Sequence, residues 1–252
     1  VFMSELPILG VLLGNSAGVG PELVAKLAVS NYYADYCRPV IIGDLRMFEH
    51  GLKVVGGDVP HYVISDLSEC DWERGYPVLD LKDQDPEQVV YGEANAYCGA
   101  SDLLQLDTAI ELCKAGKIEG FVFGPFHKGA MKMAGLHDES EHTYLAHAFN
   151  LTTPFCEVNM MDDLMTVRTT SHIPISDVSA NITEQNLREA IELGEITGES
   201  FGHKPRIAVA ALNPHCGEFG LCGREEVDVI KPTIEKVVKE TGWNVSGPYS
   251  AD

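Results

Sequence analysis

Short apolar runs alternate with amphipathic stretches along most of the chain. The runs are a few residues long and end at glycine, proline or a polar residue, which is typical of strands buried in a parallel sheet. The stretches between them repeat apolar residues with the spacing of a helix face. The pattern predicts strands at 8–13, 40–44, 61–64, 121–123, 165–172 and 207–210, and helices at 21–28, 97–115, 139–148, 184–200 and 225–239. This alternation predicts an α/β fold with a mostly parallel sheet.

The longest of these helices, 97–115, is expected to bury a single apolar face. The residues assigned to that face are Leu103, Leu104, Leu106, Ala109, Ile110 and Cys113. Gly116 ends the helix. Apart from the short strand at 61–64, the segment 53–87 is expected to be irregular.

Polar residues gather where the predicted strands end. The loop 211–226 carries three glycines together with Asn213, His215 and Glu218. Open α/β folds bind ligands at the carboxyl ends of their parallel strands, so this loop is a candidate site. A glycine-rich turn with a surface histidine explains the same residues equally well.

The loop 14–22 also contains three glycines, at positions 14, 18 and 20. Their order differs from the G-x-G-x-x-G of a dinucleotide-binding loop, and the Lys-Ser/Thr pair of a phosphate loop is missing. Asp44, at the end of the next strand, is either a ribose-binding acid or part of a turn. This part of the sequence therefore gives only a weak nucleotide signal.

Length and composition suit one large α/β unit or two smaller lobes, since 45% of the 252 residues are hydrophobic. The apolar runs are too short to span a membrane, and the first residues do not resemble a signal peptide. The seven cysteines lack CxxC spacing and are odd in number. We expect reduced thiols in a cytoplasmic protein.

Charge limits the partners. Acidic side chains number 38 and basic ones 18, so the net charge is −20 and a nucleic-acid partner is not expected. An anionic substrate then needs a few local groups. The candidates are Lys128, in the loop 124–129, and His142 with Thr143, at the start of a predicted helix. Ser140 or Thr143 acting only as a helix cap is the competing interpretation.

Four motifs, taken in order, resemble the 4-hydroxythreonine-4-phosphate dehydrogenase family of vitamin B6 (pyridoxine and pyridoxal phosphate) biosynthesis. They cover the whole chain. In sequence they are GNSAGVGPE at 14–22, GPFHKG at 124–129, HT at 142–143 with TTSHIP at 169–174, and LNPHCGE at 212–218 continuing into GREEVD at 223–228.

The resemblance implies the isocitrate and isopropylmalate dehydrogenase-like fold, with two α/β/α lobes and the active site in the cleft. We expect the lobes at 1–138 and 139–252. It also implies a homodimer whose interface completes the site, and NAD bound without the usual Rossmann loop, with NADP as an alternative. The residues that contact NAD are not assigned.

Position by position, the resemblance makes His172 and His215 two of three histidines that bind a divalent metal, with zinc favoured over magnesium or cobalt. His142 and Thr143 correspond to substrate-binding residues, and no catalytic residue is assigned beyond the metal ligands. Neutral imidazoles are suitable ligands for such an ion. The implied reaction oxidises a small phosphorylated hydroxy acid, polarised by the metal, and is followed by decarboxylation.

Two motifs depart from the family pattern. Asn15 and Ser16 stand where the family's first loop has Asp-Pro, and Glu141 stands where it has glycine before His-Thr. Glu141 places a negative charge near the expected phosphate, which raises the cost of binding that dianion unless the side chain turns away. Substrates of related enzymes therefore stay open: 4-phosphorylated threonate or erythronate, or a cyclic dihydrodiol acid.

The sequence ends at a stretch that resembles the family's GPxPAD motif. The family continues with a segment that carries the third metal histidine, in YHDQG, and the Lys, Asn and Arg that hold the substrate. We therefore expect the present chain to encode an incomplete site. Two further interpretations stay open: a non-catalytic metal-binding member of the family, and a phosphate acyltransferase of related fold.

Overall fold

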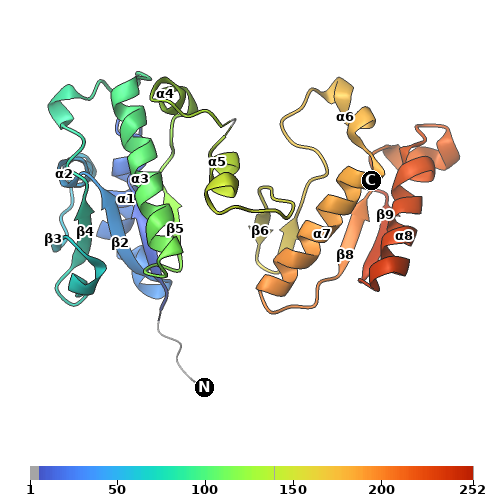
Figure 1. Cartoon of the computed structure of the whole chain (residues 1–252), viewed down its shortest axis with the longest axis horizontal. Coiled ribbons are helices and arrows are strands. Elements are labelled where there is room, and N and C mark those ends of the chain that lie inside the picture. Colours follow the sequence, from blue (N-terminus) through green and yellow to red (C-terminus); the bar gives the residue numbers. More distant parts are fainter. Residues whose placement is uncertain (1–5, 139, 252) are drawn as a thin grey trace. The chain divides into compact units, whose positions relative to one another are not determined.

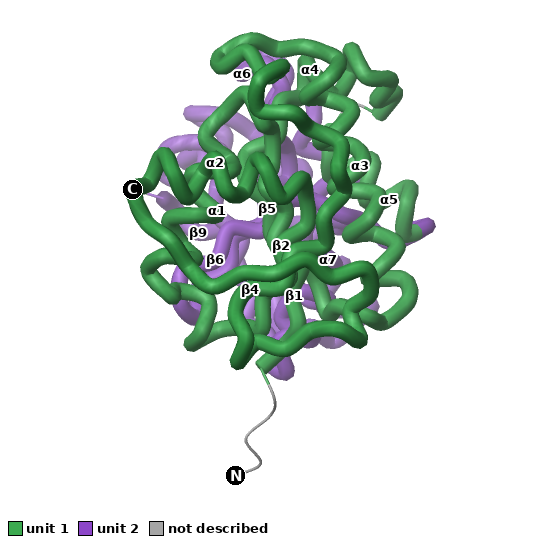
Figure 2. The backbone as a smooth tube through the Cα atoms, turned by 90° about the vertical axis from the view of Figure 1, so that its left-hand side faces the viewer, with its two compact units in different colours: residues 1–149 green, residues 150–252 purple. Residues whose placement is uncertain are grey.

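The computed structural model describes residues 6–138 and 140–251 (Figure 1). The chain forms two compact units, Val1–Phe149 and Asn150–Asp252, which are coloured separately in Figure 2. The first unit includes the helix that begins after Ser140. The lobes expected at 1–138 and 139–252 stay a prediction.

The first unit contains a sheet of five parallel strands in the order β3-β4-β2-β1-β5. The predicted α/β class with a parallel sheet is thereby confirmed. The two central strands are mostly buried, as their continuous apolar sequences indicate. The strands are β1 Ile8–Leu12, β2 Arg38–Gly43, β3 His61–Ile64, β4 Tyr76–Asp80 and β5 Gly120–Phe123.

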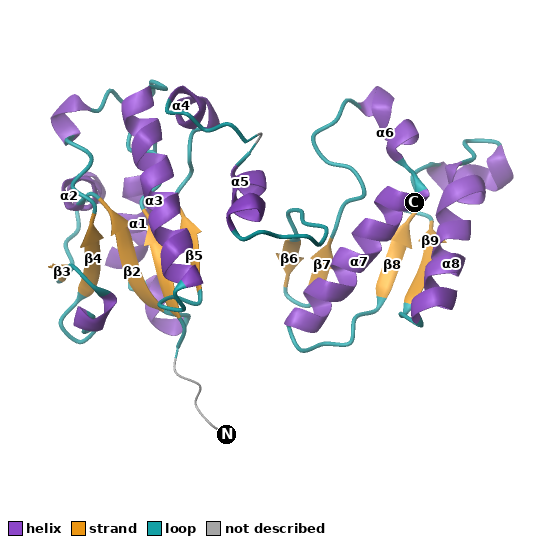
Figure 3. Cartoon of the chain, in the orientation of Figure 1, coloured by secondary structure: helices purple, strands orange, loops and turns teal. Residues whose placement is uncertain are grey.

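Helices cover both faces of this sheet (Figures 1 and 3). On one face pack α1 Gly20–Val29 and α2 Leu45–Val55, whose side chains form one core cluster with Val11, Ile41 and Val78. On the other face a second cluster joins Leu12, Val40 and Ile42 to the remaining helices of the unit. Those helices are α3 Ala96–Lys114, α4 Lys128–Met133 and α5 Glu141–Ala148.

The second unit is built around α7 Glu184–Ser200, which packs on the parallel pair β8 Ile207–Ala210 and β9 Val245–Tyr249. Helix α8 Lys231–Thr241 completes this core, with Ile234 and Val237 buried. A short antiparallel hairpin precedes α7 in the sequence. The other elements of the unit are β6 Asn159–Met161, β7 Leu164–Thr166, α6 Ile175–Asn181, the 3-10 segment η4 Pro214–Gly220 and the π-helical turn η5 Glu226–Ile230.

Several predictions on local structure were wrong. The strand expected at 165–172 ends at Thr166, because its partner β6 is only three residues long and leaves the residues beyond without a ladder. The segment 53–87 holds the end of α2, all of β4 and three-residue 3-10 turns, η2 Leu67–Glu69 and η3 Pro86–Gln88. Further elements were not expected at all: η1 Tyr32–Asp35, α2, α4, β6, α6, η4 and β9.

The buried face of α3 is more polar than expected. Leu104, which was assigned to the apolar face, is 41% exposed, whereas Asp102 and Gln105 are almost completely buried. Gly99 explains this orientation, since a Cβ there would lie 2.0 Å from the Ala130 carbonyl oxygen of α4. The close crossing of α3 and α4 turns the polar side chains inward.

Two further observations concern the whole described chain. Among the residues placed by the structure, none of the helices has the length and apolar content to cross a membrane. All seven cysteines are free thiols.

Candidate functional site

The first unit brings two loops together at the carboxyl edge of its sheet. Strand β1 lies between β2 and β5, so the chain leaves the sheet in opposite directions on the two sides of β1. This topological switch point is where open α/β sheets bind ligands. The β1–α1 loop, residues 13–19, and the β5–α4 loop, residues 124–127, both begin at this switch point.

Glycine is required where these loops meet. A Cβ on Gly14, whose φ is +77°, would lie 2.5 Å from backbone atoms of Gly124. A Cβ on Gly20 or Gly124 would lie 2.2 or 2.5 Å from the Leu13 carbonyl oxygen. The glycines of the first motif therefore allow backbone-to-backbone packing.

Backbone amides of the β1–α1 loop already donate within the protein. The N–H of Gly14 donates to Gln105 Oε1 at 2.9 Å, and that of Asn15 donates to the Pro125 carbonyl oxygen at 2.9 Å. The N–H of Ala17 donates to Asn15 Oδ1, and that of Gly18 to the Asn15 carbonyl oxygen. These four amides are therefore not available to bind the phosphates of a nucleotide, which agrees with the weak nucleotide signal of the sequence.

Asp102 of α3 is hydrogen-bonded to both of these loops. Asn15 Nδ2 donates to its Oδ2 at 2.7 Å, and the backbone N–H of His127 donates to the same oxygen at 3.3 Å. The side chain is fully buried, and its Oδ1 has no hydrogen-bond partner among the described residues. Asn15, one of the departures from the family pattern, thus has a carboxyl partner on α3.

The electrostatic surroundings of Asp102 favour its neutral form. Burial raises its pKa to about 7, and the hydrogen bonds from Asn15 and His127 only partly oppose this. The nearby carboxyl groups of Asp83 and Glu141 add to the increase. Burial also raises the pKa of Asp83.

Lys128, the predicted anion ligand, begins α4. The ring Nδ1 of His127 caps this helix by accepting the N–H of Ala130 at 3.2 Å. The Lys128 ammonium lies 3.4 Å from Glu141 Oε2, at the start of α5. Glu141 therefore turns toward a cation, which offsets the charge that its position introduces.

His142 and Thr143 occupy the first turn of α5, where Ser140 joins them. Ser140 Oγ lies 3.2 Å from His142 Nδ1 and 2.9 Å from Thr143 Oγ1, and it accepts the N–H of Thr143 at 3.4 Å. The interpretation of Ser140 as a helix cap is confirmed. The first turn of α5 nevertheless carries one imidazole and one hydroxyl group, next to Glu141, which pairs with the Lys128 ammonium.

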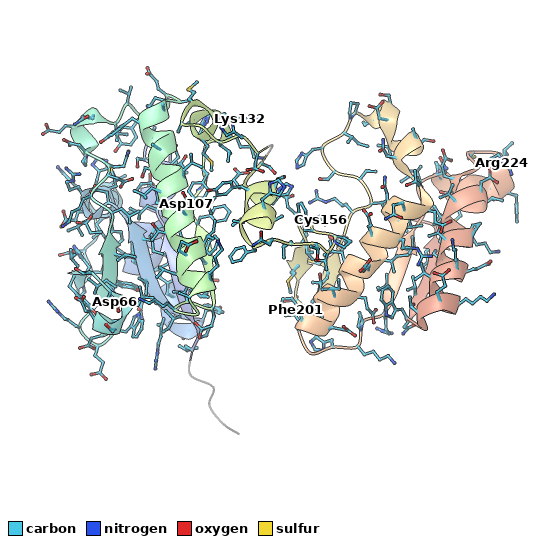
Figure 4. All side chains as sticks on the ribbon, viewed as in Figure 1. Asp66, Asp107, Lys132, Cys156, Phe201 and Arg224 are labelled. Atoms are coloured by element: carbon cyan, nitrogen blue, oxygen red, sulfur yellow. The ribbon has the colours of Figure 1, made fainter. Side chains whose placement is uncertain are left out.

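Further along, the Tyr144 hydroxyl of α5 donates to Asp107, which is labelled on α3 in Figure 4. Asp44 is the cap of α2: it is buried and accepts hydrogen bonds from Arg46 and from the N–H of Gln84. Of the two interpretations of Asp44, the structure supports the turn.

In the second unit, the loop after β8 has unusual backbone geometry. Five consecutive residues, 215–219, have positive φ between 45° and 75°. Four of them are not glycine, although this region of φ is costly for other residues. His215 and Phe219 are exposed on this segment, and Leu221 follows them. Arg224, further along, is labelled in Figure 4.

Asn213 and Glu226 hold this loop. Glu226 Oε1 accepts the N–H groups of Leu212 and Asn213 at 2.8 and 2.7 Å, and its Oε2 accepts Asn213 Nδ2 at 2.9 Å. The same Nδ2 donates to Glu225 at 2.7 Å. Asn213, one of the polar residues of this candidate loop, therefore supports the loop itself.

The donors also set the charge of the two carboxyl groups. Burial would raise the pKa of Glu226, but the Asn213 and Leu212 donors outweigh it and the pKa falls below its usual range. Hydrogen bonds from Ser179 and then Asn213 lower the pKa of Glu225 to about 2. Both side chains are ionised at neutral pH.

The predicted metal ligands His172 and His215 lie on two loops of the second unit. Both are exposed and both have positive φ, 56° and 53°. Within residues 6–138 and 140–251, no cluster of three or more His, Cys, Asp or Glu side chains has the geometry of a metal site. The assignment of these histidines to a metal stays a prediction.

The second unit also contains a groove of about 900 Å³ that the sequence did not indicate. The hairpin strand β7 lines one side, and α7 with β8 lines the other. His203, Lys204 and Arg206 make one part of its lining basic. Phe201, at the end of α7, is labelled in Figure 4.

Sequence reasoning missed Asp102, Gln105 and Glu226. The signal for the first two was a pair of polar residues spaced three apart in a helix whose neighbours are apolar, which predicts one shared buried direction. Glu226 lies in the quoted motif GREEVD, but its role depends on a turn geometry that the sequence does not specify.

Known proteins resemble this chain over nearly its whole length. A family model described as "Pyridoxal phosphate biosynthetic protein PdxA" matches residues 35–252. A Pseudomonas aeruginosa protein provisionally named 4-hydroxythreonine-4-phosphate dehydrogenase 2 is 35% identical over 98% of this chain and 74% of its own length. The D-threonate 4-phosphate dehydrogenase of Cupriavidus necator is 32% identical over 98% of this chain and 74% of its own length.

A solved structure agrees with these sequences. The crystal structure of a 4-hydroxythreonine-4-phosphate dehydrogenase from Burkholderia phymatum has a TM-score of 0.83 and 33% identity, over 99% of this chain and 76% of that one. The chain therefore belongs to the PdxA family of pyridoxal phosphate biosynthetic proteins.

Proposed function

We propose that this chain is an NAD-dependent, divalent-metal-assisted dehydrogenase of a small phosphorylated hydroxy acid, with oxidation followed by decarboxylation. NADP is the alternative cofactor. Dehydrogenases named for 4-hydroxythreonine 4-phosphate and for D-threonate 4-phosphate are among its relatives. The observation that carries the proposal is the start of α5, where His142 and Thr143 directly follow Glu141, the ion-pair partner of Lys128.

This helix end suits a phosphate group. The first turn of α5 supplies the positive end of the helix dipole, and the imidazole, hydroxyl and ammonium groups can donate to phosphate oxygens. The Glu141 carboxylate forms an ion pair with the Lys128 ammonium, with Oε2 and Nζ 3.4 Å apart, so a phosphate has to compete with this carboxylate. A substrate with a compact dianion at one end is the class that can displace it.

His172 and His215 are the residues that would hold the metal. Their imidazoles are exposed and belong to the donor type that zinc, magnesium or cobalt sites use to different degrees, with zinc the best match. When bound, the ion would polarise the substrate hydroxyl and stabilise negative charge on its oxygen. The chain's own contribution is to present these imidazoles from two loops.

The architecture expected for this function is the two-lobed isocitrate dehydrogenase-like fold in a homodimer whose partner subunit completes the site. The parallel sheet with helices on both faces supports the first part. The substrate alternatives are 4-hydroxythreonine 4-phosphate, 4-phosphorylated threonate or erythronate, and a dihydrodiol acid.

A turnover assay tests the proposal. The full chain is incubated with NAD, zinc, magnesium or cobalt, and each candidate hydroxy acid, and NADH formation is followed. We expect His172→Ala and His215→Ala to lower turnover by about 100-fold or more at saturating substrate. His142→Ala and Thr143→Ala should chiefly raise KM.

His203→Ala is the matched control, because it changes an imidazole of the second unit that lines the groove. It should retain activity. Unchanged turnover in both His172→Ala and His215→Ala would refute the metal assignment. Metal binding without NAD binding and without turnover of any substrate would favour a non-catalytic family member.

A further inference from the structure

Asp102 is a buried acid that the proposed reaction does not use. It lies on α3 one turn after Gly99, where α3 and α4 cross most closely, and its carboxyl group reaches the end of the β5–α4 loop. Through Asn15 it also reaches the β1–α1 loop. It is therefore the one described side chain seen to bond to both loops of the switch point.

The hydrogen bonds of Asp102 fit a carboxylic acid. Both donors, Asn15 Nδ2 and the His127 N–H, point at Oδ2, as they would at a carbonyl oxygen. The other oxygen, Oδ1, is buried without a partner among the described residues. Leaving a neutral hydroxyl unpaired costs much less than leaving an ionised oxygen unpaired.

The charged groups around Asp102 support the same state. Asp83 from the loop after β4 and Glu141 from α5 both oppose its ionisation. On α4 the His127 ring accepts a backbone N–H, and the Lys128 ammonium pairs with Glu141. The basic groups near the site are thus engaged with other partners.

We propose that Asp102 is a positioning residue that acts in its protonated form, joining the β1–α1 loop to the β5–α4 loop and keeping the neighbouring anion site free of a second buried negative charge. The proposal rests on the proposed function, because it places the substrate phosphate beside Lys128. Asp102 itself contacts Asn15 and His127 and does not contact the phosphate.

This role has a distinct kinetic signature. When Asp102 loses its proton, a negative charge appears beneath the phosphate site and KM should rise, while kcat changes little. Asp102→Asn imitates the protonated acid: its amide oxygen can accept both donors and it cannot ionise. Asp102→Ala removes the acceptor and loosens both loops at every pH.

The experiment measures KM and kcat for 4-hydroxythreonine 4-phosphate and D-threonate 4-phosphate from pH 5.5 to 8.5. The ratio of wild-type KM to Asp102→Asn KM should be near one at low pH and rise about fivefold above neutrality. Titration of the substrate phosphate affects both proteins and cancels in this ratio. Asp102→Ala should have a raised KM throughout.

Glu111→Gln is the matched control, since Glu111 is an exposed carboxyl of the same helix. It should follow the wild type. A KM ratio that stays constant across this pH range, or an Asp102→Asn protein that behaves like Asp102→Ala, would overturn the proposal.

A second measurement separates this proposal from the proposed function. The side-chain carboxyl carbon of Asp102 is followed by NMR in protein with ¹³C-labelled aspartate and assigned by its loss in Asp102→Asn. A titration midpoint near neutrality supports the protonated state even if neither substrate is turned over, in which case only the proposed function fails. A midpoint below about pH 4.5 would overturn the protonated state.

Discussion

Asp102 in the first unit and Glu226 in the second are both buried acids that hold a loop at the end of a parallel strand, yet their pKa values shift in opposite directions. Asp102 is fully buried and Glu226 is 2% exposed, so burial alone does not explain the difference. Burial raises the pKa of Asp102 to about 7, whereas that of Glu226 lies below its usual range.

The number and placement of donors explain the contrast. Three N–H donors are divided between the two oxygens of Glu226, so both oxygens are satisfied as a carboxylate. Asp102 has two donors on one oxygen, and its neighbours Asp83 and Glu141 are acidic. A buried acid that holds a loop is therefore ionised when donors reach both of its oxygens, and neutral when its second oxygen has no donor.

The largest effect is expected when Glu226 becomes an amide. In Glu226→Gln one oxygen is replaced by an NH₂ group that faces an N–H donor, so a buried hydrogen bond is lost and two donors oppose each other. The free energy of unfolding of the second unit should fall by about 3 kcal/mol. Urea unfolding followed by tryptophan fluorescence measures this.

The two tryptophans make this measurement specific, because Trp72 packs in a core cluster of the first unit and Trp243 in that of the second. In a Trp72→Phe background the signal reports the second unit alone. Glu225→Gln is the control, since Glu225 is less buried, and should cost about 1 kcal/mol or less. Equal losses in both variants would show that burial of Glu226 does not matter.

Replacing the Asp102 carboxyl group by an amide should raise the free energy of unfolding, whereas the same replacement at Glu226 lowers it. Because its pKa is higher in the folded protein than in the unfolded chain, Asp102 contributes stability at low pH that is lost as pH rises through about 7. Between pH 5.5 and 8.5 the wild type should lose about 2 kcal/mol relative to Asp102→Asn. The measurement is the unfolding free energy at several pH values in a Trp243→Phe background.

At pH 8.5 Asp102→Asn should therefore be the more stable protein, while Glu226→Gln is less stable than the wild type at the same pH. A constant difference between Asp102→Asn and the wild type across this range would contradict the assigned pKa. Asp102→Asn and Glu226→Gln make the same carboxyl-to-amide change, so together they test whether the two buried acids differ in charge.

The sequence predicted the elements that build the switch point. Apolar runs located β1 and β2, because strands buried on both faces need continuous apolar residues, and a third apolar run located the edge strand β5. The glycines at 14, 20 and 124 were visible, but the backbone segments that they approach were not. Close approach between loops 110 residues apart, at Gly14 and Gly124, depends on strand order, which local pattern does not contain.

The candidate site was predictable to a similar degree. His142 and Thr143 do lie at a helix start, and Ser140 caps that helix, as the competing interpretation held. Asp102 was hidden because helix periodicity was assessed with apolar residues only, and Leu104 was placed on the buried face instead. The left-handed segment at 215–219 contradicts residue propensities, so the sequence could not reveal it.

The smallest predicted effect tests whether neighbouring charge contributes to the state of Asp102. Glu141 raises the pKa of Asp102 less than burial does. Glu141→Gln should therefore lower the NMR midpoint of Asp102 by only a few tenths of a pH unit. Lys128→Gln should raise it by a similar amount, because Lys128 no longer neutralises Glu141. Shifts of opposite sign would show that the α4–α5 ion pair tunes the buried acid, whereas two unchanged midpoints would leave burial and Asp83 as the causes of its raised pKa.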